Sequence, residues 1–390
     1  MNNFKKYISI VVVLGIIFTM FAGCQKEANS STSQENVEIN EIFKSVEPLE
    51  NEMSIKVGTV STSTYGFTTF LIEELGGFEA SNLNIDQIVF GSGPVVVEAM
   101  SAGECDVATY GVTGALAGTI GQGFVTIGAS STDYKANRIY AQNDSHIVES
   151  GAQNPDYPNL LGTAEDWKGQ EIYIPLGTNL HYTLVKGLEI LGVSSEDVEL
   201  THMDVPNVNT AIRAGKAELG GVWANYIIGD LNDVATSVMD SRELDIKMVS
   251  SIQTTQEALA NKERALAIEK WLELYFIVKD WIYDSDENMT KAVELFVQWN
   301  EENGVSSTEE EIVGLLQLNN VLGLEENLEI MTTVSDKGYE NQFVEYFVEP
   351  LKFFVELGNY TQADLEKFSK PEYMDFSLVE NIAAAKASNN

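Results

Sequence analysis

Short apolar runs alternate with amphipathic stretches along this chain from Met53 onward, and this alternation predicts βαβ units. The apolar runs have the length and the Val and Ile content of strands, and the stretches between them carry apolar residues at helical spacing. The predicted strands are Ser54–Val60, Leu83–Phe90, Asp106–Tyr110, Glu171–Pro175, Val198–Met203 and Leu219–Trp223. The predicted helices include Phe70–Leu75, Pro94–Ala102, His181–Leu191 and Val208–Ala214. We therefore expect an α/β protein with mainly parallel sheets.

An internal repeat divides this α/β part into two. The segments AMSAGECDV, residues 99–107, and AIRAGKAEL, residues 211–219, both place a helix end, a glycine and a charged turn before a strand. Any βαβ chain repeats such a corner, but here each copy also follows a strand and a loop containing Gly or Pro. We expect two similar lobes joined by a crossover near residues 125–141. Ligands of such sheets bind beyond the carboxyl ends of the strands, where helix N-termini point.

A later segment, Glu269–Asn300, has a strongly helical pattern and is rich in Trp, Tyr and Phe. Aromatic residues at helical spacing pack into a core more often than they form a ligand site. We therefore expect this segment to be part of the core.

The first residues have a different pattern, that of an export signal. Lys5 and Lys6 precede an apolar run, Tyr7–Ala22, and small residues then lead into Cys24. A membrane-spanning helix is the alternative, but the run is at the short end of the ~20 residues that a span needs. The stretch before Cys24 resembles a bacterial lipobox, in which the cysteine thiol is lipidated and becomes the new N-terminus, although Phe21 stands where Leu is usual. We expect residues 1–23 to be a signal peptide and Cys24 to carry lipid.

The tract that follows Cys24 lacks apolar periodicity up to residue 52. Such a polar tract buries too little apolar surface to offset its ordering entropy, so residues 24–52 are expected to form a disordered tether. From Met53 about 340 residues remain, enough for two domains and a substantial core.

Charge and cysteine content narrow the range of partners. The chain has 23 Lys and Arg residues against 59 Asp and Glu residues, a formal net charge of -36. Such a field repels nucleic acid and anionic lipid headgroups, so neither is an expected partner. Cys24 and Cys105 are the two cysteines. With Cys24 lipidated no disulfide can form, and Cys105, in an apolar stretch, is expected to be buried.

Enzyme motifs are missing from the sequence. It contains no G-x-S-x-G elbow, no H-E-x-x-H segment and no paired Cys and His residues at metal-ligand spacing, and its histidines are scattered over His146, His181 and His202. We therefore expect no catalysis, no cofactor and no metal site.

Three segments carry a resemblance to a known family. They are GSGPVVVEAMSAGECDVATYG (91–111), DWKGQEIYIPLGTNLHYTLVKGLEILGVSSEDVEL (166–200) and AIRAGKAELGGVWANY (211–226). Through them residues 53–230 resemble the extracytoplasmic solute-binding proteins of ABC importers, in the branch associated with aliphatic sulfonates, taurine and nitrate. The tail, residues 348–382, is similar to the closing helices of that family, and the match is poorer between about 250 and 345.

This resemblance implies a two-lobed, periplasmic-binding-protein-like (type II) fold with a ligand cleft between the lobes. Residues 53–135 would form the first part of lobe 1, residues 136–245 lobe 2, and residues 246–390 the return to lobe 1 and the C-terminal helices. The implied function is a membrane-anchored, extracytoplasmic component that captures a small organic anion and delivers it to an ABC permease. The implied partners are a small-molecule ligand, the permease, and the membrane through the N-terminal lipid.

The resemblance also implies candidate ligand contacts in loops of both lobes. The candidates are Thr62, Ser63, Thr64, Tyr65, Gly91, Ser92, Gly93 and Thr113 in lobe 1, and Gly177, Thr178, Asn179, His181, Trp223 and Asn225 in lobe 2. The hydroxyl groups of residues 62–64 can equally cap a helix, and His181 and Trp223 can equally belong to the core. Many family members have Pro-Tyr where this chain has Asn225-Tyr226, so that wall of the cleft is expected to differ.

The nature of the ligand stays open. Lys135 and Arg138 are the cations nearest in sequence to the candidate loops. A sulfonate would therefore depend mainly on helix dipoles, N–H groups and hydroxyls. A zwitterion, a thiamine precursor or another heteroaromatic ligand is an alternative, nitrate is disfavoured for want of a basic residue, and a lipid-anchored sensor domain is the rival function.

Overall fold

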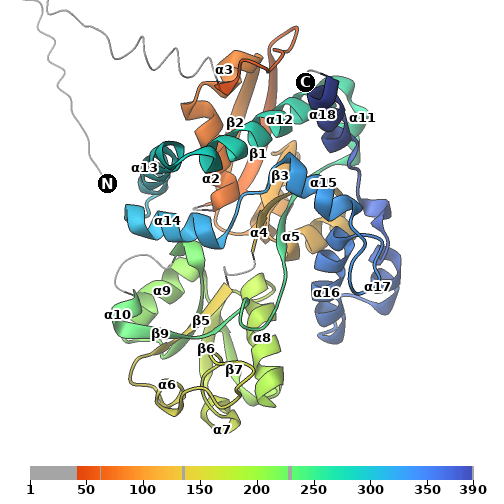
Figure 1. Ribbon diagram of the computed structural model, residues 1–390. Coiled ribbons are helices and arrows are strands. Elements are labelled where there is room, and N and C mark those ends of the chain that lie inside the picture. The colour runs from red at the N-terminus through yellow and green to blue at the C-terminus, as the bar shows by residue number, and fades with distance from the viewer. Residues whose placement is uncertain (1–41, 62, 134–136, 227–230, 389–390) are drawn as a thin grey trace, which may run out of the picture. The chain divides into compact units, whose positions relative to one another are not determined.

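Two five-stranded sheets form the framework of the chain (Figure 1). The structure is a computed structural model that describes residues 42–61, 63–133, 137–226 and 231–388. The strand orders are β2-β1-β3-β10-β4 and β7-β6-β8-β5-β9. The strands are β1 (Met53–Val60), β2 (Leu83–Phe90), β3 (Val107–Tyr110), β4 (Val125–Thr132), β5 (Asn137–Gln142), β6 (Glu171–Ile174), β7 (Glu199–His202), β8 (Leu219–Trp223), β9 (Ala235–Asp240) and β10 (Val249–Thr254).

Helices connect these strands and follow them. They are α2 (Thr64–Glu74), α3 (Gly77–Ser81), α4 (Gly93–Ser101), α5 (Val112–Leu116), α6 (His146–Ser150), α7 (Ala164–Trp167), α8 (Asn179–Leu191), α9 (Val205–Arg213), α10 (Leu231–Val234), α11 (Gln256–Ala260), α12 (Lys262–Asp284), α13 (Asp286–Glu302), α14 (Glu309–Leu318), α15 (Leu324–Thr332), α16 (Gln342–Glu356), α17 (Gln362–Phe368) and α18 (Ser377–Ser388). Helices α4 and α12 pack on β1, and α8 and α9 pack on β8.

The two sheets repeat one arrangement, as the internal sequence repeat predicts. In the first sheet β1 lies between β2 and β3 and is parallel to both, and in the second β6 lies between β7 and β8 and is parallel to both. The remaining strands depart from the expected parallel pattern. Strand β10 is antiparallel to β3 and β4, and β5 is antiparallel to β8 and β9. The expectation of mainly parallel sheets was therefore wrong for the strands next to the crossovers.

The chain passes between the sheets twice, from β4 to β5 and from β9 back to β10. Backbone hydrogen bonds hold these crossovers side by side: the N–H of Asp133 donates to the carbonyl of Met248 at 2.9 Å, and the N–H of Ser241 donates to the carbonyl of Asn137 at 3.0 Å. The predicted lobe boundaries, after residues 135 and 245, fall in these two connections. In each sheet, the strand that enters from the other sheet lies beside the edge strand from which the chain leaves: β10 lies beside β4, and β5 lies beside β9.

The aromatic segment predicted from 269 to 300 is part of the core, as expected. Helix α12 ends before Ser285, whose hydroxyl caps α13 by accepting from the N–H of Asn288 at 3.1 Å. Trp271, Phe296 and Trp299 are buried. The rings of Phe67 on α2 and Phe296 on α13 stack with their centroids 4.2 Å apart, so α13 packs on α2 as well as on α12.

The folded part begins before Met53, and this corrects the predicted extent of the tether. Phe43, Val46 and Leu49 are buried in the main core, and the N–H of Leu49 donates to the carbonyl of Ser81 at 2.9 Å. Their spacing of three residues is too short a pattern to stand out in a polar stretch. The expected signal peptide, Cys24 and the remainder of the tether up to residue 41 lie outside the described residues. Among the described helices, none has both the length and the apolar character needed to cross a membrane.

Candidate functional site

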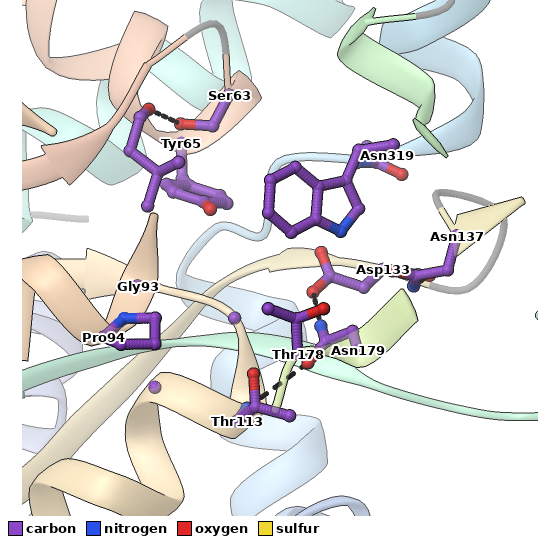
Figure 2. A pocket seen from close by; sticks show the side chains of 14 residues that line it. Ser63, Tyr65, Gly93, Pro94, Thr113, Asp133, Asn137, Thr178, Asn179 and Asn319 are labelled. Carbon is purple, nitrogen blue, oxygen red and sulfur yellow. Dashed lines mark hydrogen bonds between the residues drawn. The ribbon is translucent and has the colours of Figure 1, made fainter. Parts of the chain in front are cut away.

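One pocket lies where loops that follow both sheets meet (Figure 2). It is lined by Val60, Ser63, Tyr65, Gly93, Pro94, Gly111, Thr113, Gly114, Asp133, Asn137, Thr178, Asn179, Trp223 and Asn319. Most of these residues follow a strand directly or begin the next helix, as expected for ligand sites of such sheets. The cavity volume is about 60 Å³. Because one water needs roughly 10–15 Å³ on this measure, the space suits a solute of only a few heavy atoms.

Helix N-termini approach the pocket from both lobes, and they differ in how they are capped. The hydroxyl of Ser63 caps α2: it accepts from the N–H of Gly66 at 3.0 Å and donates to the carbonyl of Val60 at 2.6 Å. The N-cap side chains of α4 and α8, Ser92 and Thr178, make no capping hydrogen bond. The hydroxyl of Thr178 instead donates to the carbonyl of Pro175 at 2.7 Å. The first turns of α4 and α8 therefore keep N–H groups that their own cap residues leave unused.

Asp133 is the centre of the polar network in the pocket. The residue is buried, with a relative exposure of 6 %. One carboxylate oxygen accepts from the hydroxyl of Ser250 at 2.9 Å, and the other accepts from Nδ2 of Asn179 at 3.0 Å. Oδ1 of Asn179 in turn accepts from the N–H of Thr113 at 3.3 Å, so Asn179 on α8 connects the crossover with α5 (Figure 2). Burial raises the pKa of Asp133 to about 6, although the bonds from Ser250 and Asn179 work against the rise.

Two amide oxygens of lining residues have no hydrogen-bond partner among the residues that the structure describes. Oδ1 of Asn137, in the first crossover strand, and Oδ1 of Asn319, at the end of α14, are buried atoms without a hydrogen bond. The exposed fractions of these two residues are 1 % and 7 %. Buried polar atoms in proteins are nearly always paired, so these two oxygens are exceptions among the described residues.

No Lys, Arg or His side chain is among the described residues that line the pocket. Arg138 follows Asn137 on β5, and successive residues of a strand point to opposite faces. It interacts with Tyr140 and pairs in register with Asp240, so its side chain lies on the other face of the sheet from Asn137. Lys135 lies outside the described residues. Within the described part of the chain no group of three or more His, Cys, Asp or Glu residues could hold a metal ion.

The structure brings together half of the candidate contacts. Those that line the pocket are Ser63, Tyr65, Gly93, Thr113, Thr178, Asn179 and Trp223. Those that do not are Thr64, Gly91, Ser92, Gly177 and His181. Nδ1 of His181 instead accepts from the N–H of Gly177 at 3.3 Å, and its ring lies edge-on to Phe353 with the centroids 6.0 Å apart. Burial lowers the pKa of His181. Thr62 lies outside the described residues, as does the side chain of Asn225.

Seven lining residues were not among the candidates: Val60, Pro94, Gly111, Gly114, Asp133, Asn137 and Asn319. Asp133 and Asn137 flank the first crossover, directly after β4 and at the start of β5. If residues 125–132 had been assigned as a strand, Asp133 would have stood at the carboxyl end of that strand and would have been a candidate ligand contact. Asn319 lies in the segment where the family resemblance is weak, and no signal in the sequence marks it.

Two lobes on similar sheets, two crossovers and a pocket between the strand-end loops define the type II fold of periplasmic binding proteins. A protein of Brachyspira hyodysenteriae named "putative ABC transporter periplasmic binding protein" is 24% identical over 310 residues, which cover 79% of this chain and 82% of that protein. No protein-family model matches the chain.

Solved structures agree on the fold. The periplasmic aliphatic sulphonate binding protein of Escherichia coli superposes with a TM-score of 0.58 at 16% identity, covering 80% of this chain and 96% of that one. The periplasmic nitrate-binding protein of Synechocystis PCC 6803 superposes with a TM-score of 0.61 at 12% identity, covering 87% and 90%. These comparisons confirm the predicted family resemblance and the predicted fold class.

Proposed function

We propose that this chain is the solute-binding component of an ABC importer. The observation that carries the proposal is the pocket itself, in which buried polar groups from both lobes converge on a space sized for a small solute. The name of the Brachyspira relative, which places it with an ABC transporter, supports the same function. In this role the chain performs no chemistry on its ligand.

Capture would work by closure of the lobes. A solute that touches α2, α4 and the crossover on one side and α8 on the other binds the closed arrangement better than an open one. Asn179 belongs to this mechanism, because its amide already connects Thr113 of α5 with Asp133 of the crossover. The closed, loaded form would then engage the permease.

The ligand class that we propose is a small organic anion of the aliphatic sulfonate or taurine type. Its anionic group would lie at the N-termini of α4 and α8, where N–H groups without a side-chain cap can donate to it. The dipole of each helix favours a negative charge at its N-terminus by about 0.3–1 kcal/mol. The small cavity disfavours a larger heteroaromatic ligand, which is the second candidate. A sensor function for the same pocket is the remaining alternative.

We further propose that the first residues direct the chain out of the cytoplasm and that lipid on Cys24 holds it at the membrane. The charged n-region, the apolar run and the small residues before Cys24 support this proposal. Anchoring keeps a binding protein near its permease and so raises its effective concentration there.

The experiment that tests the function is a melting-temperature screen of the full chain, purified in detergent, against small solutes. The panel would contain sulfonates, taurine, nitrate, thiamine precursors, flavins and aromatic acids. A solute at a hundred times its dissociation constant stabilises the native state by about 2.7 kcal/mol, which raises the melting temperature measurably. A rise with small sulfonates alone supports the proposed class, a rise with flavins or thiamine precursors alone replaces it, and no rise with any solute contradicts the function.

A further inference from the structure

A second pocket lies between helices α8 and α16, and we call it the α8–α16 groove. It is lined by side chains of α8, of residues 244–247 in the second crossover, of residues 336–337 and of α16. Its volume is about 410 Å³, and it shares no lining residue with the pocket described above. Helix α8 packs on β5 and β8 of the second sheet, whereas α16 packs on α5, which follows β3 of the first sheet. The groove therefore lies between elements of both sheets.

The charges that line the groove do not balance. Five carboxylates and three ammonium groups line it, which leaves an excess of two negative charges. On α8, Lys186 pairs with Glu189 at 2.8 Å. On α16, Glu345 and Glu349 share Lys337, at 3.5 and 3.0 Å. The side chains of Glu345 and Glu349 are only 12 % and 25 % exposed, so water screens the excess charge on this wall incompletely.

Two charged groups of α16 just outside the lining leave this excess unchanged. Lys352 pairs with Glu349 at 2.7 Å, and Glu356 lies close enough to Tyr182 to contribute to the rise of its pKa. They add one charge of each sign. Among the described residues no group of three or more His, Cys, Asp or Glu residues could hold a metal ion, so an organic cation matches the groove better than a bare metal ion.

Tyr182 on α8 supplies a polar group without a partner. The residue is buried, with a relative exposure of 6 %, and its ring packs against that of Phe353 with the centroids 5.0 Å apart. Its hydroxyl makes no hydrogen bond to any residue that the structure describes, and the oxygen is not sealed off, so it is open to the groove that the residue lines. Burial and the nearby carboxylates of Glu349 and Glu189 raise the pKa of Tyr182. The hydroxyl thus lies near carboxylates of both helices, stays protonated, and has an oxygen free to accept a hydrogen bond.

The second crossover gives the groove an apolar part. Leu244 and Ile246 line it and are buried, and Ile190 of α8 adds a partly buried apolar side chain. Methylene groups of a ligand would leave water on contact with these side chains, which favours binding. The groove therefore combines carboxylates on both helices with an apolar surface from the crossover.

We propose that the α8–α16 groove binds an organic dication, an alkane chain with an ammonium group at each end. Its two charges match the excess of two carboxylates, its N–H groups match the carboxylates and the free hydroxyl of Tyr182, and its stem matches Leu244 and Ile246. Because carboxylates stand on α8 and on α16, such a ligand binds both helices at once and stabilises the arrangement in which they face each other. The inference goes beyond the proposed function, and since the two pockets share no lining residue, either can fail without the other.

The test uses diaminobutane, in which four methylene groups separate two amines, with butylamine and Mg²⁺ as comparisons. Calorimetric titration measures binding to the full chain in non-ionic detergent at constant ionic strength, for the wild type, Glu189→Gln and Tyr182→Phe. Glu165→Gln is the control for Glu189→Gln, because it also removes a carboxylate paired with a lysine three residues away. Tyr360→Phe is the control for Tyr182→Phe, because Tyr360 is partly buried and lines neither pocket. Circular dichroism confirms that each variant is folded, and if one groove variant is not, the other decides.

We expect diaminobutane to bind the wild type and both control variants with equal affinity. Glu189→Gln and Tyr182→Phe should each weaken its binding several-fold, and weakening in either one with its control unchanged supports the inference. Butylamine, which carries one charge, should bind at least tenfold more weakly than diaminobutane. Added salt should weaken diaminobutane binding in every variant that binds it, since the contacts are partly exposed and electrostatic.

Four results would overturn the inference. They are no binding of diaminobutane to the wild type, unchanged affinity in both groove variants, displacement of diaminobutane by an equal concentration of Mg²⁺, and equal weakening in Glu165→Gln and Glu189→Gln. The last result would mean that the acidic surface as a whole attracts the dication and that the groove adds nothing.

Discussion

At the scale of single residues, Asp133 decides what the pocket can hold. It follows β4 at the point where the chain leaves the first sheet, and its carboxylate is buried among neutral partners. Burial disfavours the charged form, which is why the pKa of Asp133 rises from 3.8 to about 6. A residue that costs stability when charged, and that lines a pocket, is typical of a binding site rather than of a structural core.

This raised pKa predicts how the stability of the unliganded chain depends on pH. The folded state binds the Asp133 proton more tightly than the unfolded state, so the stabilising effect is complete below about pH 4 and is lost as the pH rises through 6. Between pH 4 and 7 the unfolding free energy of the wild type should therefore fall relative to that of Asp133→Asn, by on the order of 3 kcal/mol at 1.36 kcal/mol per pKa unit. Urea unfolding of both proteins across this range measures the difference. A constant difference would show that Asp133 is not perturbed.

At the scale of elements, α8 connects the pocket with the second lobe. Thr178 precedes its first turn and lines the pocket. Thr183 is a buried residue within the helix, is not among the lining residues, and donates to the carbonyl of Asn179 at 2.9 Å. Both hydroxyls make a buried hydrogen bond to a backbone carbonyl. Replacing either threonine by valine removes the same kind of hydrogen bond, but only Thr178 lines the pocket.

We expect Thr178→Val to weaken solute binding about five- to tenfold, because a hydrogen bond to a ligand contributes about 1 kcal/mol or somewhat more. Thr183→Val should leave binding unchanged. Both variants should lose a similar amount of stability, on the order of 1 kcal/mol, since each loses one buried hydrogen bond. Calorimetric titration with the solute identified in the screen measures the affinities. Equal weakening in both variants would mean that the loop before α8 acts through stability alone.

The elements with a clear pattern could be predicted from the sequence, and those stabilised by distant partners could not. Strands β2 and β8 occupy the predicted residues, because each is an apolar run between turn signals. Strand β10, VSSIQT, was missed because its buried residues are mostly polar. Its Gln253 accepts from the hydroxyl of Tyr110 at 2.7 Å and donates to the hydroxyls of Thr119 and Thr126 at 2.8 and 2.9 Å. Those partners lie more than a hundred residues away, where no local pattern shows them.

The candidate site likewise contains residues that could be predicted from the sequence and residues that could not. Residues that begin a helix after a predicted strand, such as Ser63 and Thr178, could be found from the rule that ligands bind at strand ends. Asp133 and Asn137 were missed because the crossover was not resolved into two strands. Asn319 reaches the pocket through tertiary packing of α14 alone.

At the scale of the whole molecule, we expect a lipid on Cys24 to anchor the folded binding unit to the membrane. If Cys24 carries the lipid, Cys24→Ser should release the chain from membranes into the soluble fraction. Cys105→Ala is the control, because Cys105 is buried and its burial raises the pKa of the thiol to about 11, which makes it unreactive. Fractionation of cells followed by immunoblotting measures the distribution. Membrane retention of Cys24→Ser would contradict the proposed anchor.

The proposed function requires that the pocket between the two lobes captures a small solute. The most direct measurement is the melting temperature of the wild type, Thr178→Val and Thr183→Val across the solute panel. We expect one class of small solute to raise the melting temperature of the wild type and of Thr183→Val, and to raise that of Thr178→Val clearly less at the same concentration. The absence of a rise with every solute, or an equal rise in all three proteins, would contradict it.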